Sequence, residues 1–369
     1  MSTLCGASLA VLTQACHSTP DRLTGPTSPT SSVAVAAPAV PTAMVVVCDT
    51  LLMKGWRSLA TISPSSNTGA SARWEESLLC VMAIDDESVF VGLENGAILR
   101  IAKNSGALVA LVPGSVREHI TTTDLKVDAT HVYWLESTWV GDTSHGIVKR
   151  VAKTGGSIER IEDALGGAFQ AVLSPAEVYY LDPADYSAST PTLHVRKVPK
   201  SGGAGRDFSL PEHGANGMVT DGTALFVATN FWEQPEGQPW RIFRLDPRTS
   251  RFSRLGFGGS SVMAVDQTHI YWADDSGAVF RMSKAGGVAE KLCTGPIGAV
   301  GLVMDETTIY WVTRWSSIYT AVSNVMKVPK AGGEAVMLAE GGGGTEFRIA
   351  VDAHNIYWMT KNAVLVHAK

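Results

Sequence analysis

The sequence lacks the features that would assign it to several common functional classes. It has no stretch of about 18 apolar residues, the length that a membrane-spanning helix needs. Its five cysteines form no Cys-x-x-Cys pair and stand at no Cys/His spacing typical of a zinc site. It has no phosphate-binding glycine loop, dinucleotide fingerprint or nucleophile elbow. The formal net charge of −5 leaves no basic footprint for nucleic acid. We therefore expect no transmembrane helix, cofactor, structural metal or nucleic-acid partner.

Glycine and tryptophan are abundant instead. The 369 residues include 36 glycines and 10 tryptophans, and 45% of the chain is hydrophobic. This composition is typical of short strands that carry aromatic side chains and are joined by tight turns. No segment shows the 3.6-residue period of an amphipathic helix. The composition predicts an all-β protein.

One phrase recurs along the chain: an apolar strand that ends in Asp, a short turn, an aromatic strand, and a basic strand closed by a glycine pair. Its clearest copy runs from Val262 to Leu292. Aligned on the turn residue, the copies fall at Asp85, Asp128, Ser174, Asp221, Asp266, Asp305 and Asp352. The successive differences are 43, 46, 47, 45, 39 and 47 residues, the period expected of a propeller blade. Seven copies predict a seven-bladed β-propeller of four-stranded antiparallel blades.

The last copy ends without its fourth strand. Residues 363–369 form its third strand and no glycine pair follows. An open blade would expose unpaired backbone groups, so another segment must complete it. Residues 56–62 resemble the outer strands of the other copies and precede the first inner strand, residues 79–84. We expect this N-terminal strand to close the ring, within a propeller domain that spans residues 51–369.

The phrases VDATHVYW, VDQTHIYWAD and VDAHNIYW resemble those of the YWTD and NHL propellers, and more closely those of bacterial propellers with a VPKAGG phrase. The resemblance covers residues 56–369 and implies a seven-bladed propeller. The families that share these phrases include receptors, sensors, scaffolds and a few enzymes. Partner sites of the YWTD proteins do not transfer, because their domains have six blades and their extended LDG phrase leaves only a trace at Leu245–Pro247.

The first fifty residues predict export. A small, apolar run leads into Cys16, and a stretch rich in Ser, Thr, Pro and Ala follows it. This pattern resembles a bacterial lipoprotein signal with a tether, although basic residues before the run are missing and Thr13 stands where Leu is usual. A lipid anchor at Cys16, secretion with a plain signal, and an ordinary disordered leader remain open. We expect an extracytoplasmic protein, either anchored at the cell envelope or secreted.

Long insertions between the second and third strands suggest where a partner binds. In a propeller these B–C connections emerge on one face, at the mouth of the central channel, together with the links between blades. They are short in blades one, five and seven and extended in blades two, three, four and six. The insertions concentrate aromatic and charged residues, which give contact area and orientation. The candidate binding residues are Trp139, Asp142, His145, Tyr186, Trp232, Glu233, Trp240, Arg314 and Trp315.

Two functional classes follow. The first is a non-enzymatic, monomeric recognition or scaffold protein that binds a protein or glycan through these insertions. The second is a metal-assisted lyase or hydrolase at the channel mouth, with His119, His145 and His213 as candidate ligands or acid–base groups. Glu118, Asp142 and Glu212 stand near them in the sequence. The first class is favoured, because the spacing of the histidines establishes no common site. The alternative for the aromatic residues of the insertions is that they pack against their own loops and stabilise them.

Overall fold

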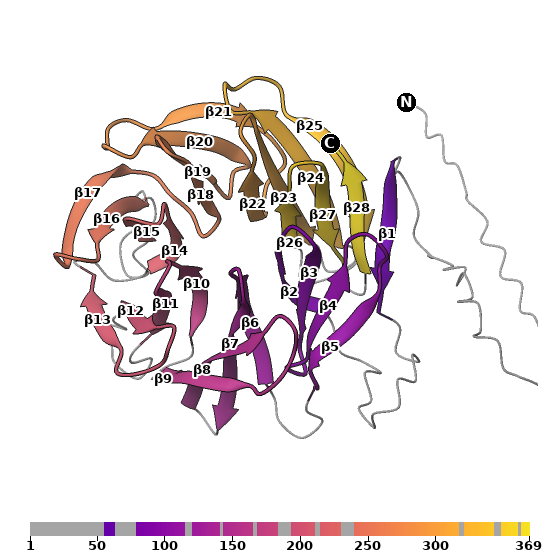
Figure 1. The fold of residues 1–369 in the computed structure, drawn as a ribbon. Helices are drawn as coiled ribbons and strands as arrows, with labels where there is room; N and C mark the ends of the chain where they lie inside the picture. The colour runs from indigo at the N-terminus through magenta and orange to yellow at the C-terminus, as the bar shows by residue number, and fades with distance from the viewer. Residues whose placement is uncertain are drawn as a thin grey trace, which may run out of the picture. The chain divides into compact units, whose positions relative to one another are not determined.

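The computed structural model of the chain is a β-propeller of seven blades (Figure 1). It describes residues 55–62, 79–114, 120–140, 143–164, 168–183, 193–210, 215–229, 240–316, 321–342, 348–360 and 363–369. Within these ranges there is no helix, and therefore no helix that could span a membrane. The all-β prediction is confirmed.

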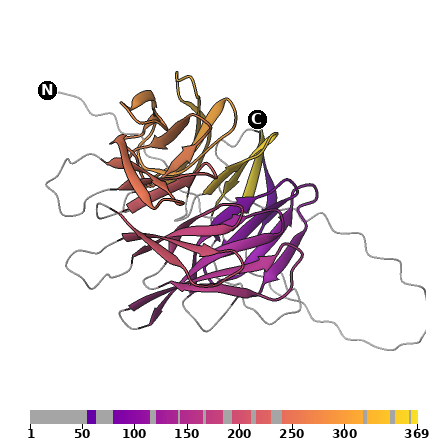
Figure 2. The same ribbon diagram turned by 60° about the vertical axis from the view of Figure 1, so that its left-hand side comes forward.

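Each blade is a four-stranded antiparallel sheet. Blade 1 contains β2 (Leu79–Ile84), β3 (Ser88–Leu93), β4 (Ile98–Ala102) and β5 (Leu108–Val112), and blade 2 contains β6 (Ile120–Val127), β7 (His131–Val140), β8 (Thr143–Ala152) and β9 (Glu159–Ala164). Blade 3 contains β10 (Phe169–Leu173), β11 (Glu177–Pro183), β12 (Leu193–Pro199) and β13 (Arg206–Ser209). Blade 4 contains β14 (Ala215–Thr220), β15 (Leu225–Thr229), β16 (Arg241–Asp246) and β17 (Arg251–Phe257). Blade 5 contains β18 (Met263–Val265), β19 (His269–Ala273), β20 (Ala278–Ser283) and β21 (Glu290–Thr294). Blade 6 contains β22 (Ala299–Met304), β23 (Thr308–Ser316), β24 (Ala321–Pro329) and β25 (Val336–Gly342). Blade 7 contains β26 (Arg348–Val351), β27 (Asn355–Met359), β28 (Ala363–Ala368) and β1 (Trp56–Thr61). We call the four strands of a blade A to D in these orders; Figure 2 shows the blades turned by 60°.

The hydrophobic core consists of seven clusters, one at each junction between neighbouring blades. Successive side chains of a strand point to opposite faces of its sheet, so two adjacent aromatics of strand B reach different neighbours. In blade 5, Tyr271 packs on blade 6 and Trp272 packs on blade 4. Both side chains are buried, as the sequence predicts for core residues.

The N-terminal strand closes the ring. β1 pairs antiparallel with β28, from Trp56 opposite His367 to Thr61 opposite Ala363. The Trp56 ring lies edge-on to Trp358, with centroids 5.7 Å apart. Leu59 is buried in the cluster between blades 7 and 1. The predicted closing strand is confirmed, whereas the leader before it lies outside the described residues.

An ion pair joins the blades at six of the seven junctions. A lysine directly after strand C of one blade reaches the Asp at the A–B turn of the preceding blade. The pairs are Lys153 with Asp85, Lys200 with Asp128, Lys284 with Asp221, Lys330 with Asp266, Lys369 with Asp305 and Lys103 with Asp352. At the junction of blades 3 and 4, Ser174 and Pro247 stand at the two positions, so the acid and the base are absent together.

Each of these aspartates also shapes its own turn. Asp266 Oδ1 accepts the N–H groups of Thr268 and His269, and Oδ2 accepts the Tyr271 hydroxyl at 2.9 Å. Partial burial is the largest influence on the Asp266 pKa and raises it, but the hydrogen bonds and the Lys330 ammonium outweigh burial and leave the pKa well below its ordinary value. Burial and the neighbouring carboxylate raise the pKa of Tyr271 to about 12. The turn aspartates therefore have a structural role.

Candidate functional site

The B–C insertion of blade 2 is a strand hairpin and not a loop. β7 and β8 pair without a break to Val140 opposite Thr143, so ten residues of each strand form one ladder. The sequence prediction of an extended loop is wrong here, because Thr, Trp and Val favour strands and only Gly141 and Asp142 separate them. Trp139 lies opposite Ser144 in this ladder. Trp139 and His145 therefore stand in paired strands.

His145 is exposed on the side of that hairpin that faces blade 1. Trp134 packs on blade 1, and residues 136 and 138 share its face because strand side chains alternate. His145 lies directly opposite Thr138, whose hydroxyl donates to the His145 carbonyl at 3.4 Å. Paired residues project to the same face of an antiparallel sheet. The His145 ring thus belongs to the blade 1 side.

A buried polar cluster supports the base of the same hairpin. Glu136 is 3% exposed, and its Oε1 accepts the indole N–H of Trp134 at 2.6 Å. The Lys149 ammonium donates to Oε2 at 2.5 Å. A buried carboxylate with both oxygens bonded is held in one position, which fixes the two strands on which the hairpin continues. Glu136 and Lys149 were not among the residues predicted from the sequence.

The insertion of blade 6 forms a second long hairpin. β23 and β24 pair to Ser316 opposite Ala321, and Trp315 lies opposite Val322. Arg314 is exposed, and its backbone N–H donates to the Gly298 carbonyl at 2.8 Å. Its side chain shares the face of Tyr310 and Val312, which pack on blade 7. The extended loop expected here is likewise largely strand.

The two hairpins stand on either side of blades 7 and 1. Between them the B–C connections are short: β3 ends at Leu93 and β4 begins at Ile98, while β27 ends at Met359 and β28 begins at Ala363. His145 on blade 2 faces blade 1, and Arg314 on blade 6 faces blade 7. These two exposed side chains therefore lie on either side of blades 7 and 1, whose short B–C connections we call the low sector of the ring.

The remaining candidates fall into two groups. Trp240 is half-buried and packs against the core cluster between blades 4 and 5, and its carbonyl accepts the Gly258 N–H at 2.6 Å. Asp142, Tyr186, Trp232 and Glu233 lie outside the described residues, as do the side chains of Trp139 and Trp315. Trp240 thus has a structural contact, and the others stay predictions.

The residues of the enzymatic alternative are mostly beyond the described ranges. His119, His213, Glu118 and Glu212 all lie there, together with Asp142. In the part of the chain that the structure describes, no three His, Cys, Asp or Glu side chains are grouped to hold a metal. The repeat histidines lie at the A–B turns, where Nδ1 of His131 and of His269 contacts the preceding threonine hydroxyl at 2.8 Å.

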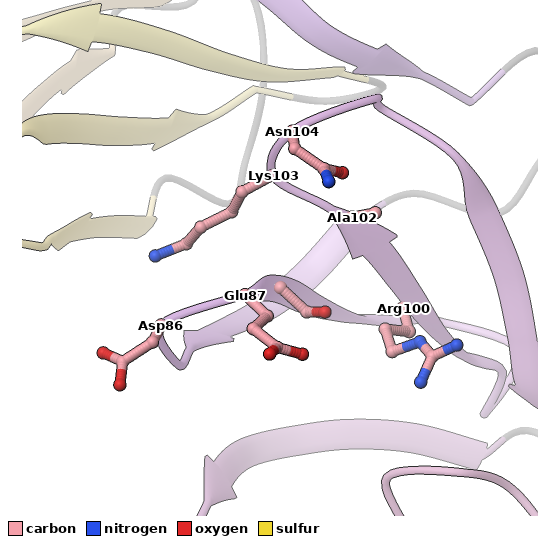
Figure 3. Close-up of a pocket in the computed structure, with 7 residues that line it drawn as sticks. Asp86, Glu87, Arg100, Ala102, Lys103 and Asn104 are labelled. Atoms are coloured by element: carbon pink, nitrogen blue, oxygen red, sulfur yellow. The ribbon is translucent and has the colours of Figure 1, made fainter.

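A polar hollow lies on the opposite face, in blade 1. Its volume is about 510 Å³, and its lining residues are Asp86, Glu87, Ser88, Arg100, Ala102, Lys103 and Asn104. Glu87 lies between Asp86 and Arg100 along one side of it (Figure 3). Lys103 is paired with Asp352, at 2.6 Å. None of its lining residues was predicted from the sequence to have a functional role.

Comparison with known proteins agrees with the fold. No family model and no curated protein sequence matches the chain. Among solved structures, the WD40 domain of Neurospora crassa Pan2 has a TM-score of 0.57 at 12% identity, covering 86% of this chain and 97% of that one. A chain of a mitotic checkpoint complex has a TM-score of 0.53 at 10% identity, over 92% and 99%. YCF48 from Cyanidioschyzon merolae has 0.52 at 10% identity, over 85% and 98%. These likenesses show the propeller fold alone.

Proposed function

We propose that this protein is a non-enzymatic recognition or scaffold protein that binds a protein or glycan partner on the face of its B–C hairpins. The supporting observation is the pair of long hairpins in blades 2 and 6, which flank the low sector of blades 7 and 1. Strands hold side chains more rigidly than loops do, so the residues on these ladders are positioned for binding. The exposed His145 and Arg314 lie on these two hairpins.

The comparisons agree with a scaffold role without identifying a partner. A chain that shares the fold belongs to a multiprotein complex, as the name mitotic checkpoint complex states. Propellers present one rigid face to a partner, and their function resides in the residues grafted onto that face. Among the described strands, B and C are longest in blades 2 and 6.

Site-specific crosslinking tests the proposed face. A photo-crosslinking amino acid replaces Trp139 or Trp315 in the full chain, and a third variant carries it at Val288, which is 94% exposed at the C–D turn of blade 5. We expect the same protein or glycan adduct from the two tryptophan positions and none from Val288. Equal adducts from all three positions, or an adduct from Val288 alone, would contradict the proposal.

We further propose that the chain is exported and anchored through a lipid on Cys16. The apolar run before Cys16 and the Ser/Thr/Pro-rich stretch after it support this. Labelling cells with radioactive palmitate should mark the full chain and leave Cys16→Ala unmarked. An unlabelled but exported wild-type protein would favour secretion instead, and retention inside the cytoplasm would refute export.

A further inference from the structure

The same arginine position recurs on the C strands of blades 1, 2 and 5, at Arg100, Arg150 and Arg281. Each arginine lies opposite the aromatic residue of strand B that packs on the next blade. Each donates from Nη1 to a backbone carbonyl of the next blade; the distances are 2.8 Å to Lys153, 2.5 Å to Lys200 and 3.0 Å to Lys330. One arm of the guanidinium is therefore fixed in the same way three times.

In blades 2 and 5 a carboxylate accepts hydrogen bonds from the other side of the guanidinium. Arg150 donates from Nε and Nη2 to Glu159 Oε2, at 3.0 and 2.5 Å. Arg281 donates from the same two nitrogens to Glu290 Oε2, both at 2.8 Å. Each glutamate stands directly opposite its arginine on strand D. In both blades, the two nitrogens that do not bond the next blade, Nε and Nη2, thus bind one carboxylate oxygen.

Blade 1 lacks this carboxylate. Val109 stands opposite Arg100 on β5 and is 45% exposed. Among the described residues, no acidic side chain lies within ion-pair distance of Arg100, and its Nε and Nη2 donate to none of them. Arg244 of blade 4 stands opposite Ser253 and also has no described acid, but no hydrogen bond holds its guanidinium to the next blade. Of the arginines at this position, and among the described residues, Arg100 alone is held to the next blade and lacks an acidic partner.

Arg100 lines the polar hollow of blade 1. Asp86 and Glu87 are exposed carboxylates on the wall of this hollow of about 510 Å³ (Figure 3). Because these carboxylates repel a ligand that is purely anionic, they favour one with a positive group beyond its carboxylate. The hollow and the B–C hairpins lie at opposite ends of the blades, so this site is separate from the proposed partner surface.

We propose that Nε and Nη2 of Arg100 bind the carboxylate of a zwitterionic ligand, in the place that Glu159 and Glu290 fill in blades 2 and 5. The positive group of the ligand lies toward Asp86 and Glu87. A free α-amino acid and a peptide with adjacent acidic and basic side chains both have this chemistry. The carboxylate of the ligand thus supplies the acidic partner that Arg100 lacks among the described residues.

Titration calorimetry on the full chain tests the site, with glycine as the free zwitterion and the end-blocked dipeptide Glu-Lys as the peptide. Ethylammonium and acetate serve as probes of each charge alone. We expect glycine or the dipeptide to bind about tenfold more tightly than acetate, because a second charged contact is made. Binding of glycine alone would identify a free ligand, and binding of the dipeptide alone would identify a peptide. Saturable binding of neither would overturn the proposal.

Three variants locate the binding. Arg100→Gln removes the donors, and Val109→Glu supplies the missing carboxylate from within; both should lower affinity by about tenfold or more. Arg244→Gln is the matched control and should bind as the wild type does. Unchanged binding in folded Val109→Glu, or an equal loss in Arg244→Gln, would overturn the proposal.

A stability measurement keeps the test independent of the ligand. Val109→Glu should raise the urea midpoint in the wild-type background and should not do so in Arg100→Gln. An equal change in both backgrounds would show that Arg100 does not present its donors there, and would also overturn the proposal.

Discussion

The Lys103 ammonium lies 2.6 Å from the Asp352 carboxylate, across 249 residues of sequence. It also lies over the ring of Tyr357, 4.7 Å from the centroid, and the Tyr357 hydroxyl donates to the same aspartate at 2.9 Å. This group of three joins the first blade to the last. At three other junctions a lysine lies over a tyrosine in the same way, at Tyr133, Tyr271 and Tyr310. At the junction of blades 4 and 5 the Lys284 ammonium lies over Phe226, which has no hydroxyl to donate to the aspartate.

Removing the aspartate of this group should destabilise the fold. Asp352→Ala deprives two backbone N–H groups, Tyr357 and Lys103 of their acceptor, and we expect a loss of about 3 kcal/mol in the free energy of unfolding. Urea denaturation measures it. Asp163→Asn, which breaks the exposed pair with Arg160, is the control and should cost less than about 0.5 kcal/mol. Equal losses would show that the junction pair contributes no more than a surface pair.

Acid should weaken the junctions together. The pKa of each of the six paired turn aspartates is lowered, for Asp305 to about 2. Because these values lie below the unfolded value of about 3.9, the carboxylates stabilise the fold fully above that pH, and the stabilisation is lost as the pH falls through the folded pKa. Urea midpoints should therefore decrease between roughly pH 4 and pH 2. Asp305→Asn should decrease less steeply over the same range; an equal slope would exclude Asp305 as a contributor.

The junction of blades 3 and 4 offers a gain of stability. Ser174→Asp and Pro247→Lys together recreate the ion pair that the other junctions have. We expect a favourable coupling of about 1 kcal/mol in a double-mutant cycle, whereas Ser174→Asp alone places an unpaired charge there. The cycle compares the urea midpoints of the wild type, both single variants and the double variant. Additive single effects would contradict the assignment of Pro247 to the lysine position.

The repeated phrase predicted the blades well because each of its parts has a local physical cause. The turn Asp, the buried aromatic pair and the positive φ of Gly286 and Gly287 each fix a piece of backbone. The partners of Lys330 were not predictable in the same way. Its ammonium reaches Asp266, 64 residues away, and only the ring geometry brings them together.

The candidate site was harder to predict from sequence. Trp139 and Trp315 were assigned to loops because the insertions differ in length between blades, yet both residues lie in paired strands. Gly141 and Asp142 between strand-forming residues were the available hairpin signal. The open guanidinium of Arg100 is a difference between repeats, Val109 where two other blades have Glu, and it has meaning only once the registers are known.

Ring closure by β1 gives the last prediction. Leu59 on β1 is as buried as Leu292 on β21, the outer strand of blade 5, and each backbone carbonyl lies against the turn glycine of the next blade, Gly106 or Gly332. Leu59→Ala and Leu292→Ala should therefore each cost about 2 to 4 kcal/mol, by loss of buried surface and the cavity that remains. Deleting residues 1–62 should cost more, because β28 then loses its hydrogen-bonding partner.

Deleting only residues 1–50 is the matched control for the closing strand, since β1 stays in place. Urea midpoints and the binding of a hydrophobic dye compare the two truncations. We expect the shorter deletion to unfold as the full chain does, and the longer one to bind dye and unfold at lower urea. If both truncations unfold at the same urea concentration, β1 does not hold the ring closed, and the apolar contacts of blades 7 and 1 must suffice without their outer strand.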